Sequence, residues 1–343
     1  MSQENQNIQE EPHKRRVRYK GKYPRNYKEK YKELNPEKYQ DTIEKVIRKG
    51  STPAGMHISI MVREIIDFLQ IKPGQTGFDA TLGYGGHTKA MLECLKGQGH
   101  MYATDVDPIE SAKTKKRLAD AGFGEDILTI RLQNFCTIDE IAKEAGGFDF
   151  VLADLGVSSM QIDNPDRGFS FKVDGPLDLR LNPEKGISAA ERLAQIDEDE
   201  LAGMLWENSD EPYAEELAHA IVTERKHGKP IDTTTRLREV IEETLSFLPE
   251  KEKKDTVKKT CQRTFQALRI DVNNEFEVLY EFMEKLPGAL KPGGRAAILT
   301  FHSGEDKLVK KALKQGYKEG IYSEIANDVV RPSAEECAQN GRA

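Results

Sequence analysis

The sequence has few cysteines and no hydrophobic run long enough to cross a membrane. None of its four cysteines has a C-x-x-C partner; they are Cys94, Cys136, Cys261 and Cys337. This spacing supports neither a zinc site nor a disulfide framework, so we expect unpaired thiols and no metal. No apolar run reaches the roughly 18 residues of a spanning helix, and Met1–Pro12 is polar, unlike a signal peptide. We therefore expect a cytoplasmic protein without membrane contact.

The sequence also lacks a positive net charge, although one segment is strongly basic. The net charge is −7 at pH 7, with 37% hydrophobic and 32% charged residues, as in a soluble globular protein. Lys14–Lys32 is almost entirely basic, with a tyrosine at every fourth position from Tyr19 to Tyr31. Basic side chains neutralise phosphates and tyrosine rings stack on unpaired bases, so this arm is a candidate nucleic-acid contact. A disordered solubilising tail has the same composition and remains an alternative.

Short apolar runs alternate with helical patterns in the first half of the chain. The apolar runs predict strands over residues 77–80, 99–104, 127–130 and 148–153. The helical patterns between them cover residues 88–95, 108–121 and 137–145. Alternation at this spacing predicts a parallel, doubly wound α/β sheet.

The alternation then stops for about a hundred residues, far beyond an ordinary loop. Helical patterns follow over residues 198–207, 214–225, 235–245 and 265–290, and a buried strand returns at 295–301 after Pro292-Gly-Gly294. We therefore predict a helical domain inserted between the fourth and fifth strands. The expected division is a basic arm over 1–50, a sheet domain over 51–163 and 257–343, and an inserted domain over 164–256.

A glycine-rich turn after the first strand is the strongest local signal of a binding site. It reads Asp79-Ala-Thr-Leu-Gly-Tyr-Gly-Gly-His-Thr88, and its glycines let the backbone approach a ligand closely. The N–H groups that begin the next helix suit an anionic group. Asp105 ends the second strand, where an acidic residue accepts hydrogen bonds from ribose hydroxyls or caps a helix. Asp107, directly before Pro108, fits the capping role better.

Two features near this turn have a second interpretation. The turn does not fit G-x-G-x-x-G because position 88 is threonine, which weakens a dinucleotide-binding interpretation. Phe135, just past the third strand, is placed to lie beside an adenine ring, but a core aromatic accounts for it equally well.

Longer motifs follow the fourth strand and the insertion. They are Asp154-Leu-Gly-Val-Ser-Ser-Met-Gln161, Arg167-Gly-Phe-Ser-Phe171, Asp174-Gly-Pro-Leu-Asp-Leu-Arg180, Arg263-Thr-Phe-Gln-Ala-Leu-Arg269 and Phe301-His-Ser-Gly-Glu-Asp306. Together with the glycine turn they closely resemble the RsmH (MraW-type) rRNA cytosine-N4 methyltransferases, from about His57 to Glu336.

The resemblance implies a class I (Rossmann-like) S-adenosylmethionine methyltransferase sheet with an inserted all-helical domain that helps to recognise RNA. It implies N4-methylation of a cytidine in the decoding region of 16S (small-subunit) rRNA, with the small ribosomal subunit as partner. Carried over position by position, it implies cofactor contacts from Gly85, Gly86, His87, Asp105, Phe135, Asp154 and Gln161.

The chain departs from the family pattern at three places. Ser303-Gly-Glu-Asp-Lys307 stands where the family has Ser-Leu-Glu-Asp-Arg, and Gly304 is expected to loosen that loop. The basic arm is additional to the usual pattern, which suggests a divergent paralogue. The chain ends at Asn340–Ala343, within a basic motif that leads into the family's last antiparallel strand, which suggests truncation or an open sheet edge.

Two residues are candidates for the chemistry itself. Asp154, after the fourth strand, is the best acceptor for an amine proton, although it could instead bind the amino group of the cofactor. His302 ends the fifth strand and could orient the base, but a histidine there is more often structural.

Other motif residues have mainly structural interpretations. One of Arg263 and Arg269 could contact RNA while the other pairs internally. Asp178 and Arg180 suggest an ion pair that stabilises a loop. Trp206 and its apolar neighbours are expected to form the core side of a helix, and Lys251–Lys259 is expected to be a solvated helix face.

Two further functions are compatible with the residues alone. A nicotinamide-dependent oxidoreductase would have the same strand–turn–helix pattern followed by an acidic residue. This chain, however, lacks the last glycine of the dinucleotide-binding motif, which argues against that function. A catalytically weak RNA-binding or assembly factor on the same fold would use the basic arm.

Overall fold

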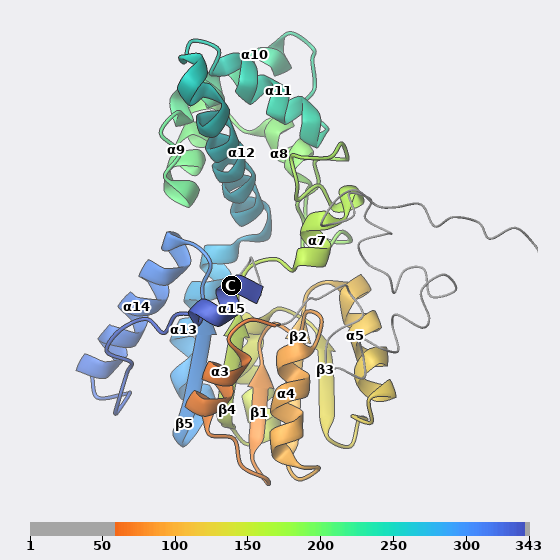
Figure 1. The fold of residues 1–343 in the computed structure, drawn as a ribbon, viewed down its shortest axis with the longest axis vertical. Helices are drawn as coiled ribbons and strands as arrows, with labels where there is room; N and C mark the ends of the chain where they lie inside the picture. Colours follow the sequence, from red (N-terminus) through yellow and green to blue (C-terminus); the bar gives the residue numbers. More distant parts are fainter. Residues whose placement is uncertain (1–58, 340–343) are drawn as a thin grey trace, which may run out of the picture. The chain divides into compact units, whose positions relative to one another are not determined.

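Five parallel strands form one sheet within residues 59–339, the part of the chain that the computed structural model describes. They are β1 (Thr76–Asp79), β2 (His100–Asp105), β3 (Leu128–Leu132), β4 (Phe148–Asp154) and β5 (Leu290–Leu299). Their order is β3-β2-β1-β4-β5 (Figure 1). This topology is that of a class I Rossmann-like sheet and confirms the predicted fold class. The strand order reverses between β1 and β4, and ligands of such sheets bind outside the carboxyl ends at that point.

Helices cover both faces of the sheet. On one face, α3 (Val62–Leu69), α4 (Gly86–Leu95) and α5 (Pro108–Asp120) share a hydrophobic core with Met101, Phe150 and Leu152. On the other face, α6 (Ile138–Ala145), α13 (Glu275–Ala289) and α14 (Ser303–Lys318) pack on Phe78 and Phe148. The helices predicted at 88–95, 108–121 and 137–145 are confirmed within one or two residues.

A third hydrophobic core lies within the segment between β4 and α13. The helices there are α7 (Ser159–Asp163), α8 (Ala189–Gln195), α9 (Glu198–Ser209), α10 (Ala214–Lys226), α11 (Thr234–Thr244) and α12 (Glu250–Asn273). We call α8–α12 the helical module. Its core runs in sequence from Phe169 to Leu268 and so includes α12. In Figure 1 the module lies beyond the end of the sheet where α7 follows β4.

The prediction for α9 is partly wrong. Leu201, Met204 and Leu205 are buried as expected, but Trp206 is 58% exposed. An α-helix turns about 100° per residue, so the residue after two buried neighbours can face outwards.

The single helix predicted over residues 265–290 is wrong. α12 ends at Asn273, and Asn274 adopts a left-handed conformation with φ 49° before α13 begins at Glu275. Apolar periodicity continues across this break, so the pattern alone did not reveal it. Asparagine is among the few residues that accept this conformation readily. Likewise, Pro292-Gly293-Gly294 lies inside β5 at a register irregularity rather than before it.

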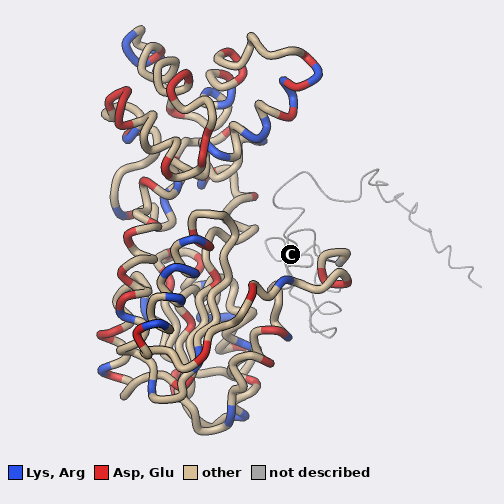
Figure 2. Tube along the Cα trace, turned by 90° about the vertical axis from the view of Figure 1, so that its left-hand side faces the viewer, with Lys and Arg blue, Asp and Glu red and all other residues tan. Residues whose placement is uncertain are grey.

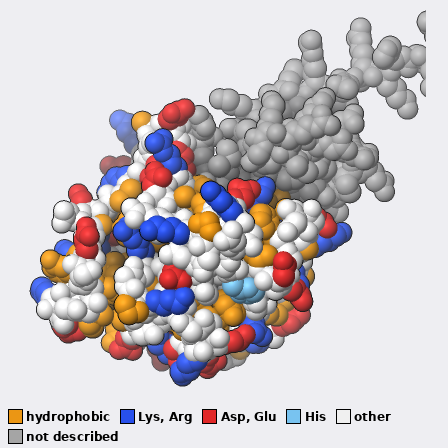
Figure 3. Space-filling view, turned by 90° about the horizontal axis from the view of Figure 1, so that it is seen from below, with side chains coloured by type: hydrophobic (Ala, Val, Ile, Leu, Met, Phe, Trp, Pro, Cys, Tyr) orange, Lys and Arg blue, Asp and Glu red, His pale blue; other side chains and the backbone are white. Residues whose placement is uncertain are grey.

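Charged residues of both signs alternate along the described chain. In Figure 2, Lys and Arg intermingle with Asp and Glu over both the sheet and the helical module. The face seen from below in Figure 3 carries both signs around small apolar patches. Within residues 59–339, no helix combines the length and the apolar character needed to span a bilayer. The basic arm at Lys14–Lys32 lies outside the described residues.

Candidate active site

Three aspartates end adjacent strands at the carboxyl edge of the sheet. Asp79 ends β1, Asp105 ends β2 and Asp154 ends β4, and β1 pairs with both of the other strands. The glycine turn after β1 therefore lies between the two acids that the sequence singled out, Asp105 and Asp154.

The glycine turn is shaped by close packing. Gly85 has φ +81°, and a Cβ there would lie 2.7 Å from Thr114 Cγ2. A Cβ on Gly86 would lie 2.1 Å from Ser59 Oγ. Gly85 is also the N-cap of α4 and supplies no side chain to its first N–H groups. The turn thus presents backbone donors at a helix N-terminus, where an anionic group is favoured.

Asp105 is held by the backbone on both sides. Its carboxylate accepts hydrogen bonds from the N–H of Gly83 at 2.8 Å and of Asp107 at 2.9 Å. Burial nevertheless raises the pKa of Asp105 to about 6, with a further contribution from nearby Asp107. Asp107, rather than Asp105, caps α5 by accepting from Ile109 and Glu110, as predicted. Asp105 is therefore free of the capping role.

His87, in the first turn of α4, pairs with Asp154 at the end of β4. His87 Nδ1 lies 3.4 Å from Asp154 Oδ2, and His87 Nε2 lies 2.8 Å from the carbonyl oxygen of Ile60. Both ring nitrogens face acceptors, which favours the doubly protonated ring. Burial opposes the charge, but Asp154 outweighs it and raises the pKa of His87 above its ordinary value. His87 thus fixes the orientation of the Asp154 carboxylate.

The second oxygen of Asp154 is the unusual atom of the site. Asp154 Oδ1 is buried and has no hydrogen-bond partner. The backbone N–H of Asp154 donates a hydrogen bond to Thr81 Oγ1 at 2.7 Å, which holds the residue in place. A buried carboxylate oxygen without a partner is costly, and a donor group placed beside it would lower that cost.

Asp79 supports this arrangement, although the sequence analysis gave it no role. It is 1% exposed and accepts from the Thr88 hydroxyl at 2.6 Å and the Thr81 N–H at 3.0 Å. Burial raises the pKa of Asp79 despite these hydrogen bonds. The signal for it was available, because an acid that ends a buried strand needs partners.

Gln161 lies in a second buried network beside the first. Its Oε1 accepts from the Ser158 N–H at 2.9 Å, and its Nε2 donates to Asp107 Oδ2 at 2.9 Å. The same Asp107 oxygen accepts from Arg167 Nη1 at 2.7 Å. The loop after β4 is therefore tied to the start of α5, and the sequence analysis missed this link because the partners lie 54 and 60 positions apart.

Phe135 follows β3 and packs against the core that α6 and α13 share with the sheet. Its ring packs edge-to-face on Phe282 of α13, with centroids 5.2 Å apart, and it is only partly buried. The packing accords with the core interpretation and leaves part of the ring accessible.

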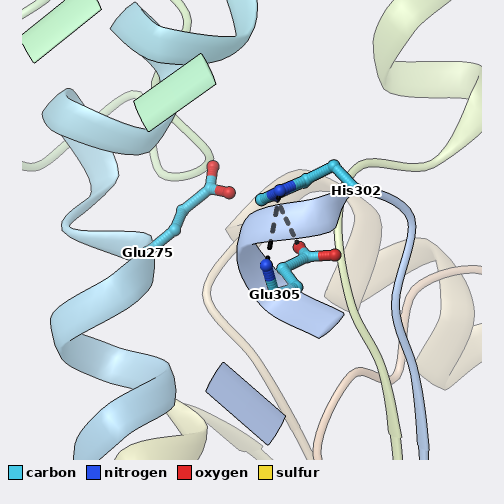
Figure 4. Close-up of side chains that lie close together, drawn as sticks. All are labelled: Glu275, His302 and Glu305. Carbon is cyan, nitrogen blue, oxygen red and sulfur yellow. Dashed lines mark hydrogen bonds and ion pairs between the residues drawn. The ribbon is translucent and has the colours of Figure 1, made fainter. Parts of the chain in front are cut away.

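His302 belongs to a cluster with Glu275 and Glu305 (Figure 4). The Glu305 N–H donates to His302 Nδ1 at 3.4 Å, so His302 caps α14. His302 Nε2 lies 3.2 Å from Glu305 Oε1 but without the geometry of a hydrogen bond.

The same three side chains could hold a metal ion by proximity, but their other contacts disfavour it. Glu275 receives two hydrogen bonds from Arg269, each 2.8 Å long, and Glu305 Oε2 accepts from the Phe301 N–H at 2.8 Å. A cation would have to displace an arginine that is itself mostly buried. The cluster instead joins α13 to α14.

Gly304 is accommodated rather than loose, contrary to expectation. A Cβ at this position would lie 2.6 Å from Phe276 Cζ and 3.2 Å from His302 Nδ1. The first turn of α14 thus packs closely on α13, and the glycine permits that contact.

Phe301 is a candidate that the sequence analysis missed. Its ring is 52% exposed, and a Cβ built on Gly156 would lie 3.5 Å from it. Gly156 is two positions after Asp154. An aromatic residue just after the last strand, beside the expected ligand edge of the sheet, is the signal that could have identified it.

The remaining motif residues are mostly structural. Arg269 pairs internally with Glu275, as expected for one of the two arginines of its motif. Asp178 and Arg180 form the predicted ion pair at 2.7 Å.

Comparisons with a family model and with individual proteins point to the same family. Residues 54–343 match the MraW methylase family. Ribosomal RNA small subunit methyltransferase H 1 of Agathobacter rectalis is 82% identical over 98% of this chain and 96% of the relative. The protein of the same name from Lachnoclostridium phytofermentans is 71% identical over 98% of this chain and 92% of the relative. Ribosomal RNA small subunit methyltransferase H of Thioalkalivibrio sulfidiphilus is 39% identical over 76% of this chain and 81% of the relative.

These alignments also bear on the basic arm. The alignment with the Agathobacter rectalis protein spans 335 of the 343 residues, so it includes Lys14–Lys32. The segment is therefore aligned in that relative and is not an insertion found in this chain alone.

Solved structures resemble the chain only distantly. A putative rRNA methylase from Clostridium thermocellum is 22% identical, covers 34% of this chain and 64% of its own, and has a TM-score of 0.25. A likeness of this size carries no argument about the site.

Proposed function

The chain belongs to the MraW methylase family, and on that premise we propose that it transfers a methyl group from S-adenosylmethionine to the N4 amine of a cytidine in small-subunit rRNA. The observation that carries the proposal is the buried, unpartnered Oδ1 of Asp154 at the carboxyl edge of the sheet. An exocyclic amine and an ammonium group are both donors that would satisfy it.

The residues at the carboxyl edge of the sheet fit S-adenosylmethionine. S-adenosylmethionine supplies a methyl group on a positively charged sulfur, which is a strong electrophile. The donors of the Gly85–Gly86 turn suit its carboxylate, and Asp105 suits its ribose hydroxyls. Phe135 offers an accessible ring for the adenine. Gln161, through Asp107, fixes the loop that would close over the cofactor.

Asp154 would act by holding a proton of the reacting amine. The N4 lone pair is delocalised into the cytosine ring, so the amine is a poor nucleophile until a proton is drawn away as the new bond forms. His87 directs one Asp154 oxygen towards itself and leaves the other free. Positioning of the amine in line with the methyl group supplies the rest of the rate enhancement.

Phe301 would place the base. An exposed aromatic ring beside Gly156 can stack on a cytosine that has left its helix, because an amine inside stacked RNA cannot be reached. His302, turned towards Glu305, would support the Phe301 loop rather than touch the base.

The finer features of the substrate follow from the same premise. We place the cytidine in the decoding region of the 16S rRNA and take the small ribosomal subunit as the partner, which puts the protein in the cytoplasm. The helical module beyond the carboxyl edge would recognise the flanking RNA. No observation favours an oxidoreductase, and the close packing at Gly304 removes a reason to expect a catalytically weak factor.

Mass mapping of small-subunit rRNA tests the proposal. RNA from cells that lack this protein should be unmethylated at one cytidine, and the wild-type gene should restore N4-methylcytidine there, whereas Asp154→Asn should not. Identical methylation of every cytidine with and without the protein would contradict the proposal.

A further inference from the structure

Two cavities border the helical module, and they differ in charge. The larger, about 370 Å³, has a lining that includes Glu200, Glu207, Asp271 and Glu277. Its one arginine, Arg192, is already paired with Asp271 and Glu200. Phosphate groups would be repelled there.

The smaller cavity, about 260 Å³, is lined by no acidic residue. It lies between the segment that follows β4 and α12. Val157 of the loop and Ile162 of α7 line it on one side, and Gln262, Phe265 and Gln266 of α12 line it on the other. Its lining therefore begins three positions after Asp154 and extends onto the helical module.

The walls of the smaller cavity suit a flat aromatic ligand. Phe169, Phe171 and Phe265 line it, and the rings of Phe171 and Phe265 meet edge-to-face at 5.7 Å. Leu179 completes the wall in a left-handed conformation with φ +63°, which a branched side chain rarely adopts. Strained residues of this kind concentrate at binding sites.

The rim of the cavity suits a phosphate and a base edge. Lys172 is exposed at the rim, and exposed Lys258 lies one helical turn before Gln262 on α12. The Gln262 side chain is exposed, and its amide can both donate and accept a hydrogen bond. The cavity thus combines ring walls, an amide and positive charge.

A buried connection joins this cavity to the cofactor side of the site. The guanidinium of Arg167 lies 5.7 Å from the ring centre of Phe169, and Arg167 is ion-paired with Asp107, which also holds Gln161. Asp107 is completely buried, so solvent does not compete for these contacts. The cavity wall and the loop beside the cofactor are therefore positioned by the same aspartate.

From these observations we propose that the smaller cavity binds the base of an unstacked nucleotide next to the methylated cytidine. The inference rests on the proposed function and deepens it. Asp154 does not line the cavity, whereas Val157, three positions later, does. The base held there is therefore a neighbour of the reacting base, with Lys172 beside its phosphate.

A double-mutant cycle, in which one change is made in the RNA and the other in the protein, tests this proposal. The RNA is a small-subunit substrate with an abasic residue immediately 5′ or 3′ of the target cytidine, and the protein is the full chain with Phe171→Ala and Gln262→Ala together, which removes a ring wall and the amide. A stacked base contributes about 1–3 kcal/mol, so one abasic position should raise the KM for RNA roughly 5- to 100-fold with the wild-type protein. With the double variant, the same abasic change should alter KM less than about threefold.

Controls separate the possible failures. The double variant should keep the wild-type affinity for S-adenosylmethionine, and Lys226→Ala, an exposed lysine of the same module, should behave as wild type. If wild-type protein methylates intact RNA but abasic changes act equally on wild type and double variant, the cavity holds no neighbouring base and the proposal is overturned. If intact RNA is not methylated at all, the proposed function itself fails.

Discussion

At the scale of single residues, the site depends on carboxylates whose surroundings differ. Asp154 has one oxygen beside His87 and one without a partner, whereas both oxygens of Asp105 accept backbone hydrogen bonds. An aspartate can therefore serve proton transfer at position 154 and ligand recognition at position 105. Substitutions at the two positions should produce different kinetic effects.

Asp154→Asn should lower kcat about 100-fold or more, because the amide cannot accept the amine proton as charge develops. If Asp154 serves the amine, the affinity for S-adenosylmethionine should change little; if it serves the cofactor, that affinity should fall as well. Single-turnover rates and calorimetric titration of the cofactor distinguish the two. Wild-type turnover together with wild-type affinity would remove both roles.

Cofactor affinity should rise with pH through the pKa of Asp105. Burial raises this pKa to about 6, so the carboxylate that would accept from ribose hydroxyls is mostly neutral below that pH. Titrations between pH 5 and pH 8 should show affinity increasing up to a plateau above about pH 7, and Asp105→Asn should bind weakly without that dependence. An unchanged profile in the variant would assign the dependence to another group.

The same shift acts on stability with the opposite sign. Between the ordinary value of 3.8 and about 6, native Asp105 binds more protons than the unfolded chain does. Its contribution to the stability of the cofactor-free protein is thus present at low pH and is lost as pH rises through this window.

At the scale of elements, the joint between α12 and α13 connects the helical module to the sheet. Asn274 ends α12 there in a left-handed conformation, and the Arg269–Glu275 pair spans the joint with side chains only 13% and 15% exposed. Because α12 belongs to the core of the module and α13 to the core of the sheet, this pair helps to set their relation.

Arg269→Met should destabilise the protein by about 3 kcal/mol, because it leaves the Glu275 carboxylate mostly buried without its partner. The midpoint of urea unfolding measures the change, and adding Glu275→Gln should recover part of it. Arg131→Met is the matched control, since the Arg131–Glu144 pair is 43% and 53% exposed and should cost less than about 1 kcal/mol. Equal losses at the two positions would contradict a special role for the joint.

At the scale of the whole molecule, positive charge is concentrated before the described fold. Residues 1–58 contain 14 of the 51 Lys and Arg but 8 of the 58 Asp and Glu, so they carry a net charge of +6 and the remainder carries −13. Figure 2 shows both signs mixed along the remainder. The arm is therefore the chain's most concentrated source of attraction for RNA phosphates.

Neutralising the arm should weaken RNA binding in a salt-dependent way. Replacing six basic residues between Lys14 and Lys22 with glutamine in the full chain removes up to six phosphate contacts. The slope of log K against log salt should then decrease in magnitude by up to about 4, with the affinity for S-adenosylmethionine unchanged. Filter binding over 50–300 mM salt measures the slope; an unaltered slope would make the arm a solubilising tail.

The sequence alone determined the layout of the sheet and the identity of the family. Strands and their helices follow from apolar runs of the right length, and the motifs lie within contiguous segments such as Asp79–Thr88 and Asp154–Gln161. Such local patterns can be recognised without knowing which distant segments are in contact, because backbone preferences and the periodicity of burial act over a few residues.

Only the tertiary structure decided which side chains meet. The partners of Asp107 lie more than fifty positions away, the close approach of Phe276 explains Gly304, and the left-handed Asn274 ends a helix whose apolar pattern continues. The unpartnered Asp154 oxygen is likewise a property of three-dimensional burial. Hydrogen bonds and packing between distant segments have no signature in local sequence, and strand pairing brings Asp79, Asp105 and Asp154 to adjacent strand ends.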